Sequence, residues 1–387
     1  MTIRSEIKKI ENEIVKWRRD FHKYPELSFE EHLTSKKIGE ELKKMGMNPK
    51  MKIGKTGIVS DLKFGEGPII ALRADMDALP MQEKSNLSFK SKHEGIMHAC
   101  GHDAHMAMLL GVAKTLSEYK KDLKGTVRFI FQPAEEGKGG ARYMINDGCL
   151  EGVKEIYGLH VWNYQPVGEI GVKEGPVMAA ADMFYIKVKG VGGHGAAPQG
   201  TVDSIVVSAH LIQALQTIVS RNINPLDNAV ITVGKINGGN NFNIIADEVL
   251  IEGTARSYTE DNRTLIKSKM NQIIEGISNT YGAKINFEYE DGYPPTINDL
   301  NCSAKVLKAA KSVVGDKASS PYLSMGGEDF SYYLQKIPGC FFFVGSAPNP
   351  TKLFETPQHC SHFDIDEKSL LIGPSVFLNL VDNILAD

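Results

Sequence analysis

The chain has 387 residues, of which 42% are hydrophobic and 24% are charged, and its formal net charge at pH 7 is -3. These values are typical of globular proteins and argue against the disordered, fibrous and membrane classes. No long block of like charges occurs, so the charge pattern does not favour nucleic acid or an anionic membrane as a partner. A chain of this length is too long to fold around a single hydrophobic core, so we expect two domains.

The N-terminal segment 1–26 carries charges every few residues and lacks the apolar stretch that is typical of a signal peptide. It predicts an amphipathic helix, and no apolar run is long enough to cross a membrane. The 5 cysteines are widely spaced and odd in number, which favours reduced thiols; they are Cys100, Cys149, Cys302, Cys340 and Cys360. We therefore expect a cytoplasmic protein.

Predicted helices and strands alternate through the first half of the chain. The hydrophobic periodicity predicts helices at 4–22, 29–45 and 104–119, and strands at 57–62, 68–75, 126–133 and 155–162. Such alternation predicts an α/β domain with a mostly parallel sheet flanked by helices.

The pattern changes near Ala180. The next predicted elements are a strand at 183–193, a helix at 201–221, strands at 229–236 and 248–257, a helix at 262–281 and a strand at 284–290. This β-α-β-β-α-β order is ferredoxin-like. After Pro294 the first pattern resumes, with a helix at 301–314, a strand at 340–346 and a helix at 369–385. We therefore expect a catalytic domain formed by 1–181 and 294–387, with an α+β domain, 182–293, inserted into it.

The segment MHACGHDAH, residues 97–105, concentrates groups that carry chemistry. In extended backbone Cys100 and His102, and also His98, point to the same side, and thiolate and imidazole suit zinc. The pair Cys100 and His102 equally fits a cysteine nucleophile with a histidine base. It also fits a buried cysteine beside a histidine that begins a helix. The spacing alone leaves all three interpretations open.

Further polar residues lie at or just beyond the ends of other predicted strands, in RADMDALP, QPAEEG and GLHVW. Functional groups gather at the carboxyl ends of strands in open α/β sheets. Of the adjacent Glu135 and Glu136, one can bind a metal while the other takes a proton from water, although a solvated turn fits the same residues. With Cys100 and His102, the candidates Glu136, His160 and His359 exceed what one structural zinc uses and suffice for two divalent ions.

Motifs along nearly the whole chain resemble those of the M20 family of metallopeptidases and metallo-aminoacylases, in its amidohydrolase branch. In order they are DFHKYPELSFEE, RADMDALP, MHACGHDAHMAMLLG, FQPAEEGKGGA, GLHVWN, GVGGHGAAP, NIIADEVLIEGTAR, MGGEDFSYY and HCSHFDIDE. The resemblance implies a zinc-peptidase-like catalytic domain with an inserted ferredoxin-like lid or dimerisation domain. It implies hydrolysis of the amide bond of N-acyl amino acids with two divalent ions, Zn²⁺ being expected and Mn²⁺, Co²⁺ or Ni²⁺ being alternatives.

The resemblance also implies roles for single residues. The implied metal ligands are Cys100, His102, Glu136, His160 and His359, with Cys100 bridging, and Glu135 is the implied general base. The last motif departs from the family pattern, because Cys360 and Ser361 follow His359 where a small residue and proline are usual. His362 is therefore a competing ligand, although the downstream FDIDE favours His359.

Other residues are expected around these ligands. Asp75, Asp77 and His98 are expected to support the ligands by hydrogen bonds. By the same resemblance, His194 stabilises the oxyanion, in its own subunit or across a dimer, and Asn243, Arg256 and Gly327 contact the substrate.

The expected partner is a small N-acyl amino acid, and the relatives imply a homodimer or homotetramer. A dipeptidase or carboxypeptidase of the same family is the closest rival. A binding protein for amino-acid conjugates without catalytic turnover is the rival from another class.

Overall fold

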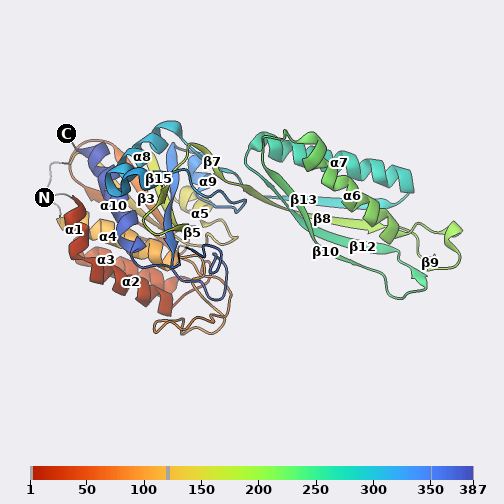
Figure 1. Ribbon diagram of the computed structural model, residues 1–387, viewed down its shortest axis with the longest axis horizontal. Coiled ribbons are helices and arrows are strands. Elements are labelled where there is room, and N and C mark those ends of the chain that lie inside the picture. Colours follow the sequence, from red (N-terminus) through yellow and green to blue (C-terminus); the bar gives the residue numbers. More distant parts are fainter. Residues whose placement is uncertain (1–2, 119–122, 350, 387) are drawn as a thin grey trace. The chain divides into compact units, whose positions relative to one another are not determined.

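The computed structural model describes residues 3–118, 123–349 and 351–386. Two compact units divide the chain. The first comprises 1–177, 297–322 and 329–387, and the second comprises 178–296 and 323–328. Figure 1 colours both along the sequence.

The first unit contains an eight-stranded sheet in the order β1-β2-β4-β3-β5-β16-β6-β15. Its strands are β1 (Lys50–Ile53), β2 (Gly57–Lys63), β3 (Ile69–Asp75), β4 (Thr126–Gln132), β5 (Val153–Pro166), β6 (Ile170–Gly171), β15 (Ala318–Ser319) and β16 (Gly339–Ala347). The central neighbours β4, β3, β5 and β16 are parallel. Strands β3 and β16 are buried along almost their whole length, as expected for parallel strands covered on both faces. The α/β prediction with a mostly parallel sheet is confirmed.

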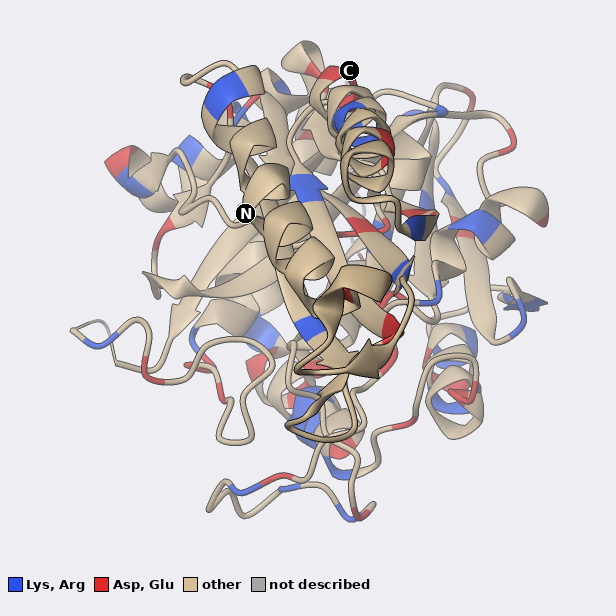
Figure 2. Cartoon of the chain, turned by 90° about the vertical axis from the view of Figure 1, so that its right-hand side faces the viewer, with Lys and Arg blue, Asp and Glu red and all other residues tan. Residues whose placement is uncertain are grey.

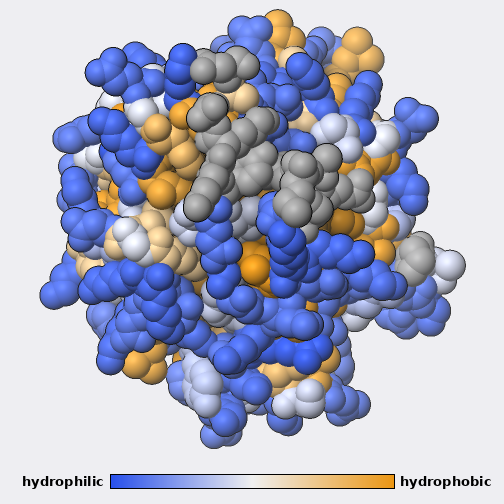
Figure 3. Space-filling view, turned by 90° about the vertical axis from the view of Figure 1, so that its left-hand side faces the viewer, coloured by the Kyte–Doolittle hydropathy of each residue, from blue (hydrophilic) through white to orange (hydrophobic). Residues whose placement is uncertain are grey.

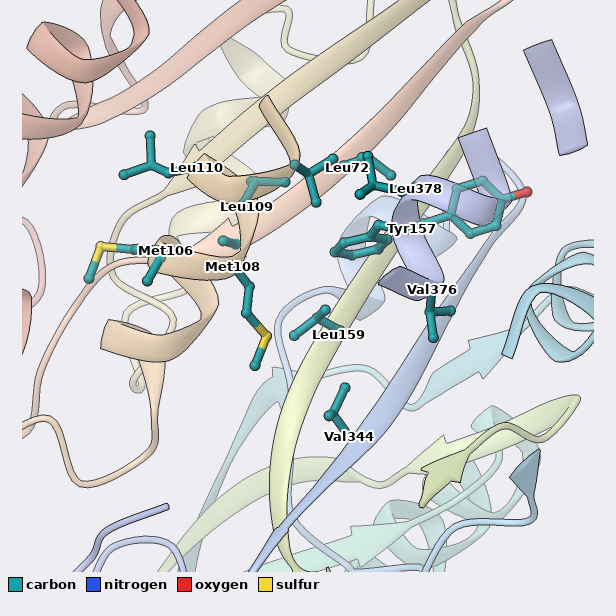
Figure 4. Packing of buried hydrophobic residues seen from close by; sticks show 14 of the residues in the cluster. Leu72, Met106, Met108, Leu109, Leu110, Tyr157, Leu159, Val344, Val376 and Leu378 are labelled. Atoms are coloured by element: carbon teal, nitrogen blue, oxygen red, sulfur yellow. The ribbon is translucent and has the colours of Figure 1, made fainter. Parts of the chain in front are cut away.

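The helices of this unit are α1 (Ile3–Lys9), α2 (Glu11–Lys23), α3 (His32–Lys44), α4 (His102–Glu118), α5 (Gly140–Asn146), α8 (Leu300–Val314), α9 (Ser331–Leu334) and α10 (Ser369–Leu385), with a 3-10 turn at Gly315–Lys317. Helices α2 and α10 both pack on α4, and α8 packs on α10. Figure 4 shows how side chains from β3, α4, β5, β16 and α10 meet in one hydrophobic core.

The single helix predicted at 4–22 is wrong in one respect, because the chain turns at Ile10 between α1 and α2. Apolar residues on both sides of the turn, including Ile7 and Ile14, are buried in the core, so the hydrophobic periodicity continues across the turn. Of the predicted helix at 104–119, Tyr119 lies outside the described residues.

The second unit is a four-stranded antiparallel sheet with two helices. Its elements in chain order are β8 (Ala180–Lys189), α6 (Ser204–Asn222), β10 (Ala229–Gly238), β12 (Glu248–Ser257), α7 (Glu260–Tyr281) and β13 (Lys284–Tyr293). The sheet order β10-β12-β8-β13 is that of a ferredoxin-like fold. Alternate residues of β8 pack with α6 and α7 in a separate core.

Shorter strands complete the structure. In the second unit β9 (Gly193–His194) pairs with β11 (Ile244–Ile245), and the turn Pro198–Gly200 follows β9. Strands β7 (Gly175–Met178) and β14 (Thr296–Asn298) pair where the chain passes between the units.

The surface carries charges of both signs. Basic and acidic segments are interspersed in Figure 2, and hydrophilic side chains cover most of the face seen in Figure 3. Within the described ranges, no helix has the length and apolar content needed to span a bilayer.

Candidate metal centre

The carboxyl ends of β3 and β4 and the middle of β5 bring the predicted site together. In the parallel ladders Asp75 pairs with Gln132, and Arg73 pairs with Gly158. Asp75, at the end of β3, is therefore level with His160. The expectation that His160 lies at or just beyond the end of its strand is wrong, because β5 continues to Pro166 and carries His160 in its interior.

Cys100 belongs to two groups of potential metal ligands. One group is Cys100, His102 and His160, and the other is Cys100, Glu136 and His359; within each group the ligand atoms lie within 4.8 Å of one another. The Cys100 Sγ lies 3.4 Å from His160 Nε2. The His359 Nε2 lies 3.2 Å from Glu136 Oε1. This arrangement suits two ions that share one thiolate.

Hydrogen bonds leave the outward ring nitrogens of two histidines available for a metal. The Nδ1 of His102 is 2.7 Å from the Asp77 backbone oxygen, and the Nδ1 of His160 is 2.6 Å from the Val161 oxygen. Each Nδ1–H therefore donates, which leaves Nε2 as the atom that can face a metal. Among the described residues, His102 Nε2 is buried without a hydrogen-bond partner. Such an orphaned atom fits a bound cation.

The electrostatics of the site also favour a cation. Burial, reinforced by Glu136, Glu135 and Asp75, raises the pKa of the Cys100 thiol well above its usual range. A free thiolate is therefore disfavoured, which argues against the cysteine-nucleophile interpretation. Although burial opposes it, Asp75, Asp77 and Glu136 raise the pKa of His102 to about 10. The carboxylates thus stabilise positive charge at this place.

Asp77 fixes the turn that carries Glu135 and Glu136. Its Oδ1 accepts the Glu135 N–H at 3.0 Å, and its Oδ2 accepts the Glu136 N–H at 3.0 Å. The Ser28 hydroxyl donates to the same Oδ2 at 2.6 Å. Glu135 is 6% exposed, and its Oε1 accepts the Asp329 N–H at 3.4 Å. The carboxylate of Glu135 is thereby held next to His102 and Glu136 in a further potential ligand group.

Asp75 organises a second histidine, His105. The Asp75 Oδ1 is 2.6 Å from His105 Nδ1, while the Val161 N–H donates to His105 Nε2 at 2.9 Å. Arg73 donates to Asp75 Oδ2 at 2.6 Å. His105 thus ties α4 to both β3 and β5 and supports the strand that carries His160.

His98 does not make the hydrogen bond expected of it. It is 1% exposed, and neither ring nitrogen has a partner among the residues that the structure describes. Burial lowers its pKa to about 4, so the ring is neutral. Its ring packs 6.5 Å from that of His22, at the edge of a buried polar cluster.

That cluster fixes the start of α4 and was not predicted from the sequence. Asp103 Oδ2 accepts hydrogen bonds from Arg18 Nε at 3.1 Å and from His22 Nδ1 at 2.8 Å. Arg18 also bonds Asp364 and Glu367, which follow His359 in the chain. The available signal was the motif DFHKYPELSFEE, which contains His22 but neither Arg18 nor Asp103.

His359 lies in a loop with a left-handed backbone, φ 63°, and 53% of its side chain is exposed. Its N–H donates to the Ala99 oxygen at 2.8 Å, which joins this loop to the segment of Cys100. The competing His362 is bonded to Ser361 instead and belongs to no potential ligand group among the described residues. The geometry therefore favours His359.

The remaining predicted residues belong to the second unit and form two local pairs. The Gly195 N–H donates to the Asn243 oxygen at 2.8 Å, beside the exposed His194 on the paired strand β9. A Cβ at Gly327 would lie 3.6 Å from Arg256 Nη1. The Arg256 Nε donates to the Thr254 hydroxyl at 3.1 Å, and burial lowers the pKa of the guanidinium.

Replacing Asp75 by asparagine should weaken metal binding by about 10- to 100-fold, because an amide cannot accept bonds from both Arg73 and His105. Titration calorimetry of metal-free protein with Zn²⁺ measures the change. Asp61→Asn, which alters an exposed carboxylate paired with Arg128, is the matched control and should bind as the unaltered protein does. Equal affinities in the two variants would contradict a supporting role for Asp75.

Comparison with known proteins gives one consistent result. The model of peptidase family M20/M25/M40 matches residues 71–383. N-acetyl-L-cysteine deacetylase of Bacillus subtilis is 45% identical over 95% of this chain and 87% of its own length. Thermostable carboxypeptidase 1 of Saccharolobus solfataricus is 42% identical over 96% of this chain and 95% of its own.

A solved structure agrees with these relatives. The Bacillus subtilis YXEP protein, described as a dinuclear metal binding peptidase from the M20 family, superposes with a TM-score of 0.84 at 37% identity. The match covers 97% of this chain and 98% of that one. Together with the ligand groups around Cys100, these similarities identify the chain as a member of peptidase family M20/M25/M40, a metal-dependent amidohydrolase with two divalent ions.

Proposed function

We propose that this amidohydrolase cleaves N-acyl L-amino acids, releasing a carboxylic acid and a free amino acid. The observation that carries the proposal is the pair of ligand groups sharing Cys100, with the Glu135 carboxylate beside them. In this assignment the ions are held by Cys100, His102, Glu136, His160 and His359. The relative named as an N-acetyl-L-cysteine deacetylase supports an N-acyl amino acid as substrate.

The proposed metal is Zn²⁺, which thiolate, imidazole and carboxylate suit; Mn²⁺, Co²⁺ and Ni²⁺ are the alternatives. Bound ions would polarise the amide carbonyl and lower the pKa of water at the site. Glu135 is proposed as the general base. It accepts a proton from the attacking water and later donates that proton to the leaving nitrogen, which departs as the amine of the amino acid.

Residues of the second unit supply the proposed substrate contacts. The His194 ring would donate to the oxyanion, and the Arg256 guanidinium would pair with the substrate carboxylate through two parallel hydrogen bonds. In the described part of the chain, Arg256 forms no ion pair, which leaves its charge available for such a carboxylate. Asn243 and the backbone at Gly327 complete this set. Assembly as a homodimer or homotetramer and a cytoplasmic location are part of the same proposal.

A carboxypeptidase activity is the second candidate, favoured by the similarity to thermostable carboxypeptidase 1. Both activities break an amide bond next to an amino acid that carries a free carboxylate. They differ in whether the acyl part is a simple acid or a peptide. The first proposal is preferred because the deacetylase has the higher identity to this chain, 45% against 42% for the carboxypeptidase.

A substrate panel separates the two candidates. N-acetyl and N-benzoyl amino acids are compared with blocked dipeptides that share the same C-terminal residue, and the released amino acid is quantified with each added metal. We expect kcat/KM to be higher for the simple acyl amino acids. Higher kcat/KM for blocked dipeptides would establish the carboxypeptidase instead, and binding without product release would indicate a binding protein.

Replacing Glu135 by glutamine should lower kcat by about 10²- to 10⁴-fold, because the amide cannot accept the proton from water. Metal content, measured by elemental analysis, should stay unchanged. Glu151→Gln, in the turn before β5, is the control and should retain full turnover. Near-normal hydrolysis by the Glu135 variant would exclude its role as the base.

A further inference from the structure

Three consecutive backbone amides in the turn after β4 donate to two buried carboxylates. Asp77 accepts the N–H groups of Glu135 and Glu136, as described above. The N–H of Ala134 donates instead to Glu31 Oε1 at 2.9 Å, across 103 positions of sequence. The turn is thus fixed from two directions by groups outside it.

Ala134 has a backbone conformation that needs such support. Its φ is 54°, in the left-handed region that residues with a Cβ rarely adopt. The residue is fully buried and immediately precedes Glu135. If Ala134 relaxed to a right-handed or extended conformation, the direction of the Glu135 side chain would change.

Glu31 is an unusual residue to find at this place. It is completely buried, and it accepts hydrogen bonds from the Phe29 N–H at 2.9 Å and from the Thr56 hydroxyl at 2.5 Å. No Lys or Arg among the described residues forms a salt bridge with it, and burial together with Asp77 raises its pKa to about 7. Burying an acid without a cationic partner is costly, so an apolar side chain would serve packing alone better.

We propose that Glu31 is a positioning residue for the proposed base, Glu135: its carboxyl group holds Ala134 in the left-handed conformation and so aims the Glu135 carboxylate. The proposal rests on the catalytic role of Glu135 given above. It assigns a role to Glu31, the last residue of DFHKYPELSFEE, which takes part in none of the proposed metal or substrate contacts.

Two neutral variants of similar size isolate this role. In Glu31→Gln the amide oxygen still accepts the N–H groups of Phe29 and Ala134, while its NH₂ group donates to the Thr56 hydroxyl. In Glu31→Met the volume is kept but every acceptor is lost. The two variants therefore differ in the hydrogen bonds to the turn and not in charge.

The test measures kcat, KM and metal content for both variants with an N-acetyl amino acid. We expect Glu31→Gln to stay close to the unaltered protein. Glu31→Met should lose about 10- to 100-fold in kcat, as for a misplaced catalytic group, with little change in KM and with both ions retained. Equal kcat in the two variants, or a loss explained by missing metal, would overturn the proposal.

Glu26→Met is the matched control within the same motif. The Glu26 carboxylate accepts the Leu33 and Thr34 N–H groups at the start of α3, at 3.1 and 2.8 Å, and does not bond the turn. Its loss should lower the melting temperature and leave kcat unchanged. A fall in kcat equal to that of Glu31→Met would show a general effect of destabilisation and overturn the proposal.

Folding is monitored by the fluorescence of the 2 tryptophans, Trp17 and Trp162, which both lie in the first unit. Should Glu31→Met not fold, Thr56→Val and Thr56→Ser replace it, since only the serine keeps the hydroxyl that donates to Glu31. Valine should lower kcat by about two- to five-fold, the effect of one lost hydrogen bond, and serine should not; equal kcat would overturn the proposal.

The outcome for Glu135→Gln distinguishes a failure of the role proposed for Glu135 from a failure of the role proposed for Glu31. If that variant retains turnover, the proposed role of Glu135 as the base fails, whatever Glu31 does. If Glu135→Gln is inactive while Glu31→Met and Glu31→Gln are equally active, only the role of Glu31 fails.

Discussion

The buried carboxyl group of Asp77 and its own backbone carbonyl connect the parts of the site. The carboxylate accepts the N–H groups of Glu135 and Glu136, and the carbonyl accepts the Nδ1–H of His102. One residue thus fixes the proposed base, one proposed ligand and the tautomer of another. Because its partners come from the turn after β4 and from α4, their relative positions depend on where the end of β3 lies in the sheet.

The shared thiol is the second constraint on the chemistry. A buried cysteine surrounded by carboxylates holds its proton firmly, as the raised pKa of Cys100 indicates. Cations would make the thiolate stable, and their binding would release a proton. A cysteine in both ligand groups would therefore couple the two ions to each other and make binding of the pair dependent on pH.

Much of the fold followed from the sequence, because hydrophobic periodicity reports local structure. The strand predicted at 248–257 and the helix predicted at 369–385 coincide with β12 and α10. Short strands such as β6 and β15 were not predicted, since two residues are too few to show a hydrophobic period. The turn at Ile10 was not predicted either, because the apolar residues before and after it keep the spacing of a helix.

The candidate site was predictable as residue types and motifs, but not as contacts. Nothing in the sequence reports that Asp103 meets Arg18 and His22, or that Glu31 reaches Ala134, since these pairs are distant in the chain. His98 shows the opposite error, because a polar residue inside a site motif was expected to have a partner and has none among the residues described. Long-range polar pairs depend on tertiary packing, which leaves no periodic signal.

The central claim is that Cys100 belongs to both metal positions, and metal stoichiometry tests it most directly. The unaltered protein and the variants Cys100→Ala and Cys149→Ala are dialysed against the same low metal concentration, and bound ions are counted by elemental analysis. The account predicts two ions in the unaltered protein and in Cys149→Ala, whose thiol is buried outside every ligand group of the described residues. It predicts loss from both positions in Cys100→Ala. Retention of two ions by Cys100→Ala would contradict the account.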